Sequence, residues 1–212
     1  MKKLVLSAAL LAASGIFFSA FRKSAPASLT TTNAQNVATK WVLDKSHSNI
    51  RFTVTHMVVS EAEGSFKSFD GTFVAEKADF SDAKINFTID VNSINTDNEN
   101  RDKHLKGDDF FNAEKFPQIK FESTAFKPQG GNKYKLEGNL TVRDITKPVS
   151  FDVTYGGTIA SGRGAKAGFK AKTSIDRFEF GLKWNRMTEA GGLAVGKDVE
   201  VTVNIELNEA KQ

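Results

Sequence analysis

The stretch that decides the fold runs Lys84-Ile85-Asn86-Phe87-Thr88-Ile89-Asp90-Val91, in which polar and apolar side chains alternate without a break. Successive side chains of a β-strand point to opposite faces of the sheet, so a period of two is typical of a strand with one buried face. A helix would instead repeat its apolar residues three and four positions apart. The stretch therefore predicts a half-buried strand of an antiparallel sheet.

The same alternation recurs on both sides of this stretch. Clear strands are predicted at 50–56, 134–142, 149–155, 167–175 and 199–207, weaker ones at 64–75 and 118–126, and a lead-in at 41–43. Turn-forming residues separate them at Glu63-Gly64, Phe80-Ser81-Asp82, 129–132, 144–148 and Gly156-Gly157. About eight short strands joined by short turns predict an all-β sandwich or up-and-down barrel. The barrel is favoured because closure removes exposed strand edges.

Two segments outside this pattern carry their own expectations. Thr96 followed by Glu99 three residues later forms a capping-box pattern, and Gly107 supplies a stop. These residues predict a short helix over 97–106. The segment Arg177-Phe178-Glu179-Phe180 is expected to continue a strand, with Arg and Glu on one face and the two Phe on the other.

The N-terminus predicts export. Met1-Lys2-Lys3 is basic and the residues from Leu4 to Phe18 are almost wholly apolar, as in a secretory signal peptide, here assigned to 1–27. The run is shorter than the about 20 apolar residues of a membrane span, so no stable span is expected after processing, although an uncleaved anchor is the alternative. Residues 28–39 lack periodicity and are predicted to be a disordered leader before a barrel domain over 40–209.

Charge and cysteine content narrow the classes of partner. The chain has 29 basic and 25 acidic residues, and four of the basic ones lie in the predicted signal peptide. The remainder is balanced, which argues against a nucleic-acid partner. There is no cysteine for a disulfide or a thiolate. A mature chain of this length can bury one core without disulfides.

Short motifs in chain order resemble the YceI-like polyisoprenoid-binding family. They are Trp41-Val42-Leu43-Asp44, Ser46-His47-Ser48, Phe52-Thr53-Val54-Thr55-His56-Met57, Gly64-Ser65-Phe66, Phe69-Asp70-Gly71, Arg101-Asp102-Lys103-His104-Leu105, Asp109-Phe110-Phe111, Phe116-Pro117, Phe121-Glu122-Ser123, Leu140-Thr141-Val142-Arg143, Lys147-Pro148-Val149 and Arg177-Phe178-Glu179-Phe180-Gly181. The resemblance implies an eight-stranded, lipocalin-like antiparallel barrel with one or two short helices, whose lumen takes an isoprenoid chain such as a polyprenyl phosphate or a quinone tail. It also implies a periplasmic or secreted protein. One departure is Arg143-Asp144, where many relatives have a Gly-containing turn.

The composition agrees with an apolar lumen without proving one. Of 18 Phe, 15 follow Ala27, whereas the whole chain has only two Tyr and two Trp. Phe adds bulk without a polar group. An eight-stranded barrel can be filled by side chains or can hold one ligand, so both stay open. The predicted ligand-binding residues are Phe52, Val54, Phe87, Ile89, Phe121, Leu140, Phe151 and Phe169 on inward faces, with His56 as a polar contact to a headgroup.

Catalytic and metal chemistry find little support in the sequence. The three histidines, His47, His56 and His104, have no cysteine to join them, so no metal site is expected. No Gly-x-Ser-x-Gly elbow or phosphate loop occurs, and neither catalytic residues nor a cofactor are predicted. Arg101 and His104 are expected to anchor the helix to the barrel.

The expected function is therefore binding of an isoprenoid lipid as a carrier or storage protein, not catalysis. One alternative is an exported enzyme acting on a lipid-linked or small substrate, with His56 and Arg101 as acid–base and anion-binding groups. Another is a filled barrel with a structural or stress-response role. A homodimer is left open.

Overall fold

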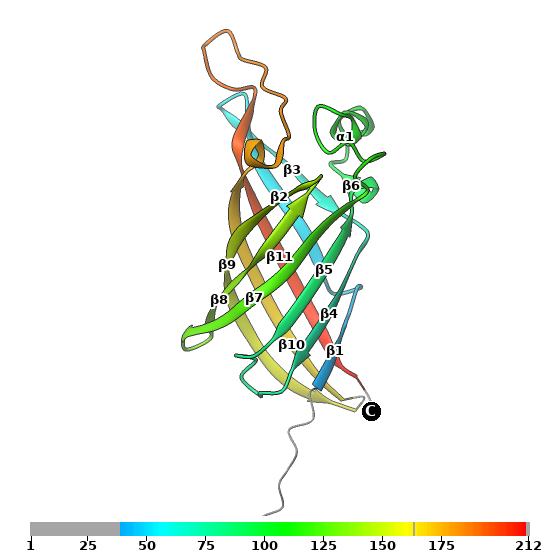
Figure 1. Cartoon of the computed structure of the whole chain (residues 1–212), viewed down its shortest axis with the longest axis vertical. Helices are drawn as coiled ribbons and strands as arrows, with labels where there is room; N and C mark the ends of the chain where they lie inside the picture. The colour runs from blue at the N-terminus through cyan, green and yellow to red at the C-terminus, as the bar shows by residue number, and fades with distance from the viewer. Residues whose placement is uncertain (1–38, 163, 211–212) are drawn as a thin grey trace, which may run out of the picture. The chain divides into compact units, whose positions relative to one another are not determined.

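The computed structural model describes residues 39–162 and 164–210, which form antiparallel strands, one α-helix and two short 3-10 helices (Figure 1). The strands are β1 (Thr39–Leu43), β2 (Asn49–His56), β3 (Ser60–Phe66), β4 (Phe69–Ala75), β5 (Lys84–Asp90), β6 (Ile94–Asn95), β7 (Gln118–Gly130), β8 (Lys133–Val142), β9 (Ile145–Ser161), β10 (Gly164–Asp176) and β11 (Val195–Glu209). The helical segments are η1 (Val91–Ser93), α1 (Glu99–Lys106) and η2 (Arg177–Phe180). The predicted signal peptide and all of the predicted leader except Thr39 lie outside the described residues.

The sheet closes on itself. Both β1 and β2 pair with β11, with Leu43 opposite Leu207 and Val54 opposite Val199, so they form two halves of one barrel strand. In the same way β3 and β4 form the second strand, and β5 continues into β6 to form the third. With β7 to β11 this makes eight barrel strands, each antiparallel to its neighbours. The predicted fold class, an eight-stranded antiparallel barrel, is confirmed.

Two of the predicted turns are wrong, and the one predicted at 144–148 is displaced to 143–144 because β9 begins at Ile145. Gly64 lies inside β3, opposite Phe52, and the chain reverses earlier, between β2 and β3. Gly156-Gly157 lies inside β9, at a shift in register against β10, and Gly157 has a φ of 110°. Glycine in a strand marks a bulge or a close approach as well as a turn, and here it serves those two purposes.

The helix is where the sequence predicts it, but its cap is not. The Asn98 side chain, not Thr96, caps α1 by accepting a hydrogen bond from the Arg101 N–H at 3.0 Å. Thr96 instead donates through both its N–H and its hydroxyl to the Asp102 carboxylate, at 2.9 and 2.6 Å. Gly107 ends the helix as expected. The capping-box prediction is wrong because Asp102 takes Thr96 away from the helix terminus.

The expected strand at Arg177-Phe178-Glu179-Phe180 is also wrong, because these residues form η2. The Asp176 carboxylate accepts a hydrogen bond from the Phe178 N–H at 2.9 Å, and Gly181 ends the turn with a φ of 75°. A helical turn buries Arg177 and Phe180 together, which strand alternation would not do.

The barrel has two distinct ends. The upper end in Figure 1 carries the β2–β3 turn, α1 and the 181–194 loop, and the lower end carries the β4–β5 and β9–β10 connections. No helix among the described residues is long and apolar enough to cross a membrane.

Candidate functional site

A cavity of about 230 Å³ lies inside the barrel, far larger than the about 10–15 Å³ that one water molecule requires. Every barrel strand contributes side chains to its wall. Among the described residues that line it, only Arg51, Thr173 and Arg177 are polar. The interior is therefore an apolar compartment that can hold an apolar molecule. The cavity argues against the alternative in which side chains fill the barrel.

The residues predicted to face the lumen divide into two groups. The apolar ones all line the cavity: Phe52, Val54, Phe87, Ile89, Phe121, Leu140, Phe151 and Phe169. His56, by contrast, is exposed at the end of β2 and is not among the lining residues. The geometry of the cavity supports the eight apolar residues as ligand contacts and gives His56 no such support, and the binding role of all nine stays a prediction.

Three of the lining rings lie against glycines of a neighbouring strand. A Cβ atom added to Gly64 would overlap the Phe52 ring, and one added to Gly71 would lie 2.6 Å from Cδ2 of Phe87. A Cβ on Gly138 would overlap the Phe121 ring. The missing side chains let these rings lie close to the barrel wall, which leaves space at the centre of the lumen.

Sequence reasoning missed the residues that close the upper end of the cavity. Leu105, Phe110, Phe111, Phe180 and Leu182 all line it and come from α1, η2 and their flanking loops. Period two finds only residues on strands, so it gives no signal for these. The adjacent aromatics Phe110 and Phe111, in the otherwise polar segment before β7, were the one sequence signal for residues that close the upper end.

Arg177 is a buried charged residue that lines the cavity. Its side chain is almost fully buried, and its guanidinium donates hydrogen bonds to the carbonyl oxygens of Leu182, Val195 and Gly196 at 2.8, 3.0 and 2.8 Å. Burial lowers the pKa of Arg177, since it penalises the charged form, although a guanidinium stays protonated at neutral pH. These bonds fasten the loop after η2 to the start of β11.

Arg143 holds the other covering loop. Its Nη1 donates to the carbonyl oxygens of Asp108, Phe110 and Gly181 at 3.2, 3.1 and 2.9 Å. Arg143 has a φ of 57°, in the left-handed region that glycine adopts most easily. Arg143 thus joins the loop after α1 to the loop after η2.

Arg101 and His104 hold α1 in place. Arg101 donates to the hydroxyl and the carbonyl oxygen of Thr96, both at 2.7 Å. His104 lies 3.1 Å from the Asp109 carboxylate and packs edge-on against Phe110 and Trp184. These contacts agree with the predicted anchoring role. Neither Arg101 nor His56 lines the cavity, so the structure does not place the proposed acid–base and anion-binding pair at the lumen.

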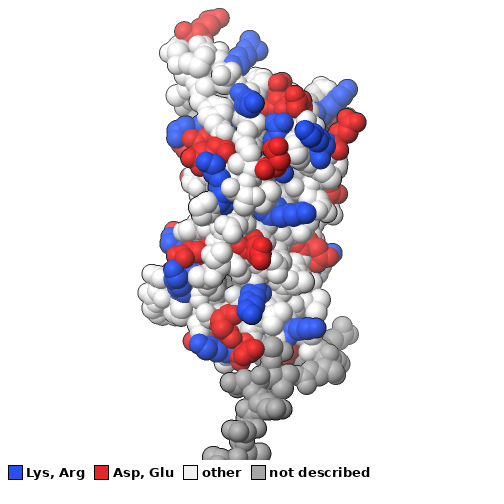
Figure 2. All heavy atoms as spheres, viewed as in Figure 1, with Lys and Arg blue, Asp and Glu red and all other residues white. Residues whose placement is uncertain are grey.

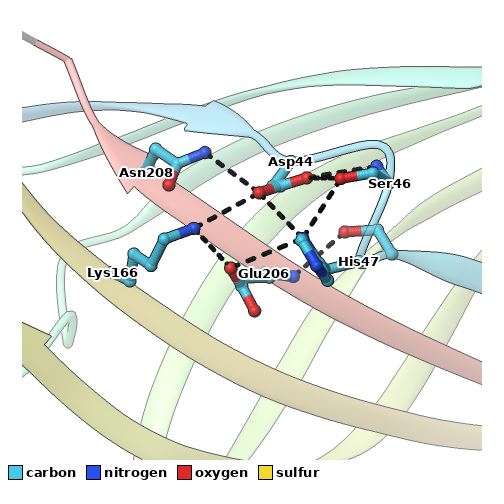
Figure 3. A network of polar contacts seen from close by, with 7 residues as sticks. Asp44, Ser46, His47, Lys166, Glu206 and Asn208 are labelled. Carbon is cyan, nitrogen blue, oxygen red and sulfur yellow. Dashed lines mark hydrogen bonds and ion pairs between the residues drawn. The ribbon is translucent and has the colours of Figure 1, made fainter. Parts of the chain in front are cut away.

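A second polar cluster lies on the outside of the barrel (Figure 3). The Asp44 carboxylate is 3.1 Å from His47 Nδ1 and 3.3 Å from Lys166 Nζ, and Lys166 also donates to Glu206 at 2.6 Å. Asp44, His47 and Glu206 offer ligand atoms close enough for a metal ion. Lys166 forms ion pairs with both carboxylates, and the resulting network ties the β1–β2 bend to β10 and β11.

Hydrogen bonding shifts the acidity of this network. The pKa of Asp44 lies well below its ordinary range, chiefly because the Ser46 hydroxyl donates to the carboxylate, with further help from His47, Lys166 and Asn208. The hydrogen bond to Glu206 raises the pKa of Lys166. Both shifts favour the charged forms at neutral pH.

Fold and cavity together define a closed up-and-down barrel with an apolar lumen. The YceI-like domain family matches residues 41–207, and the chain belongs to that family. It is 37% identical over 183 residues to Protein YceI of Salmonella newport, covering 85% of this chain and 92% of that protein. It is 35% identical over 172 residues to a UPF0312 protein of Staphylococcus aureus, covering 80% and 98%.

Solved structures share the architecture. BcnA of Burkholderia cenocepacia matches with a TM-score of 0.67 and 26% identity, covering 77% of this chain and 98% of that one. The YCEI protein of Campylobacter jejuni matches with a TM-score of 0.62 and 28% identity, covering 80% and 97%. A polyisoprenoid binding domain of Saccharophagus degradans, at 12% identity and a TM-score of 0.58 over 80% of this chain and 98% of that domain, shares the fold.

Proposed function

We propose that this protein is an exported carrier or storage protein that binds an isoprenoid lipid in the lumen of its barrel. The observation that carries the proposal is the apolar cavity, whose few polar lining residues include an Arg177 already bonded to three backbone carbonyls. Membership of the YceI-like family supports it, as does the shared fold with a domain described as polyisoprenoid-binding.

The chemistry of the wall suits a hydrocarbon chain. Each CH₂ moved from water into such a lumen is worth about 0.8 kcal/mol, so 15 carbons supply roughly 10 kcal/mol before the cost of ordering the chain. A polyprenyl phosphate or a quinone-type lipid has such a chain. We propose that the chain occupies the lumen and that the protein binds it without changing it, in the periplasm or after secretion, as the apolar N-terminal run of the sequence suggests.

Native mass spectrometry of the purified protein, followed by organic extraction, tests the proposal. We expect a bound lipid of isoprenoid mass that is released by solvent. A protein that carries no lipid and takes up no fluorescent isoprenoid analogue would contradict the proposal and restore the structural or stress-response alternative.

A larger side chain at position 87 tests whether the ligand lies in the lumen. Phe87 borders the cavity and is only partly buried, so Phe87→Trp should leave the barrel folded while it weakens binding of the analogue about tenfold. Ile159→Trp is the control, because Ile159 is 68% exposed on β9. Phe151→Trp probes a lining ring that is only 8% exposed. Normal binding by folded Phe87→Trp and Phe151→Trp would show that the lipid lies elsewhere.

A further inference from the structure

Exposed apolar side chains gather at the upper end of the barrel. The described residues include six large apolar side chains that are exposed, and four of them form what we call the apolar tip: Met57, Val58, Val59 and Met187, at 45, 62, 87 and 56% exposure. Three of these are consecutive in the turn between β2 and β3. A contiguous exposed apolar patch on a protein of this kind marks an interaction surface or an aggregation hazard.

The two segments of the tip are fastened to each other. The Met57 N–H donates to the carbonyl oxygen of Ala194 at 2.9 Å, and a Cβ atom on Gly192 would lie 2.5 Å from Cγ2 of Val58. Met187 pairs with Leu193 across its loop. The β2–β3 turn and the 181–194 loop therefore lie side by side at the upper extremity of the barrel, where Figure 1 draws them in cyan and orange.

The backbone of the turn is unfavourable for the residues it carries. Met57 and Val58 have φ values of 53° and 69°, the left-handed region that β-branched residues rarely adopt. Two successive turn residues in this left-handed region favour Asn-Gly. Here three apolar residues occupy a site where polar ones would fold more easily, and such local violations are expected at functional positions.

The tip lies near the upper end of the lumen. Val54 lines the cavity three residues before Met57, and Val195 lines it directly after the 181–194 loop. His56, the last residue of β2, pairs with Val195. A molecule in contact with the tip is therefore close to the upper end of the cavity.

We propose that the apolar tip inserts into the surface of a lipid bilayer, so that an isoprenoid lipid can pass between the membrane and the lumen. This inference rests on the proposed function. A stable protein interface needs about 800 Å² and some 20–30 residues from each partner, far more than four side chains supply. A bilayer makes no such demand, because each inserted apolar side chain leaves water independently.

The charges around the tip indicate how it would bind. Arg186 and Glu189 flank Met187 and both are exposed, and Figure 2 shows acidic and basic side chains together near the upper end. Because charges of both signs lie beside Met187, binding should depend on the apolar residues. We therefore expect it to persist on uncharged lipid and to change less than about twofold when the salt concentration rises severalfold.

Co-sedimentation with phosphatidylcholine vesicles tests the proposal. The protein is used in the form in which it is purified from the cells that produce it. Val59→Asp and Met187→Asp should each weaken vesicle binding about tenfold, since each places a charge on the inserting face. Ile159→Asp is the matched control at an exposed apolar site on β9, and it should bind vesicles as the parent chain does. Melting curves establish that the variants fold.

A second assay separates this inference from the proposed function. A fluorescent isoprenoid analogue added from ethanol should bind all four proteins equally, whereas its transfer out of vesicles should be about tenfold slower for the two tip variants.

Equal vesicle binding and transfer by folded tip variants would overturn membrane insertion by the tip while leaving the proposed function intact. Failure of every protein to bind the analogue would overturn the proposed function itself. A change from dimer to monomer in the tip variants, with vesicle binding unaltered, would make the tip a self-association surface instead.

Discussion

The two ends of the barrel are closed in different ways. At the lower end Phe80, from the β4–β5 connection, is 5% exposed and packs against the rings of Trp41, Tyr155 and Phe169 at centroid distances of 5.3, 5.6 and 5.1 Å. The Tyr134 hydroxyl donates to the carbonyl oxygen of Asp79 at 2.9 Å and holds the same connection. This end is a packed aromatic plug.

At the upper end, loops cover the cavity and arginines hold the loops. Arg143 donates to the carbonyl oxygens of Phe110 and Gly181, and Arg177 donates to that of Leu182. Bonds of this kind can be exchanged for bonds to water as a loop moves, whereas an aromatic plug loses its packing outright. We therefore expect lipid to enter and leave at the upper end, beside the apolar tip, while the lower end keeps the barrel together.

The largest expected effect is loss of the plug. Phe80→Ala should lower the free energy of unfolding by about 3–5 kcal/mol, because it leaves a cavity among rings that cannot close over it. Urea denaturation measures this. Val42→Ala, at a side chain that is 54% exposed, should change it by less than about 0.5 kcal/mol. A loss at Phe80 no greater than the control would mean that the lower end is not a structural seal.

Removing the Arg177 hydrogen bonds at the upper end should lower the stability of the protein less than loss of the plug does. It should also change the rate at which the bound ligand is released. Arg177→Met leaves three carbonyl oxygens without their donor, which should cost about 1–3 kcal/mol of unfolding free energy. Release of a bound isoprenoid analogue should become faster, whereas Phe80→Ala should change it less. Arg186→Met, at an exposed arginine, is the control. Unchanged release from Arg177→Met would argue against exchange at the upper end.

Adding a methyl group at Gly64, in the wall of the lumen, should weaken ligand binding more than it lowers the stability of the fold. Gly64→Ala forces the far edge of the Phe52 ring inward, and because that ring borders the cavity it can move at a cost of only about 1 kcal/mol. We expect weaker binding of the analogue, measured by fluorescence titration. Gly168→Ala is the control, because nothing lies within 4 Å of the added atom. Equal binding by the two variants would show that the glycine does not set the width of the lumen.

The smallest effect concerns pH. The pKa of Asp44 is lowered in the folded protein, so its contribution to stability is present above the ordinary pKa near 4 and is lost as the pH falls through the folded value. Asp44→Asn should therefore melt at a lower temperature than the parent chain at pH 7, with the difference shrinking toward pH 3. Lys84→Gln, at an exposed lysine on β5, controls for surface charge. A constant difference across this range would exclude the proposed linkage.

Much of the site could be predicted from strand alternation alone. Phe87 and Ile89 were expected to face inward because they are two residues apart on a strand, and every other apolar residue chosen in this way lines the cavity. His56 was chosen from its place in a motif, and the structure leaves it exposed beyond the lumen. A pattern with a period of two determines the face of a residue, but it carries no information about where the cavity ends.

Alternation in the sequence by itself determined an all-β fold of about eight strands, each with one apolar face, because these features follow from residues that are neighbours in the chain. The closed eight-stranded barrel was implied by the resemblance of the motifs to the YceI-like family. Tertiary structure decided the roles of Gly64, Phe80 and Arg177. Gly64 looked like a turn until Phe52 of the neighbouring strand was placed over it. Phe80 and Arg177 close the two ends through contacts with residues far along the chain or across a loop. Such roles depend on the closed barrel, since only closure brings these partners together.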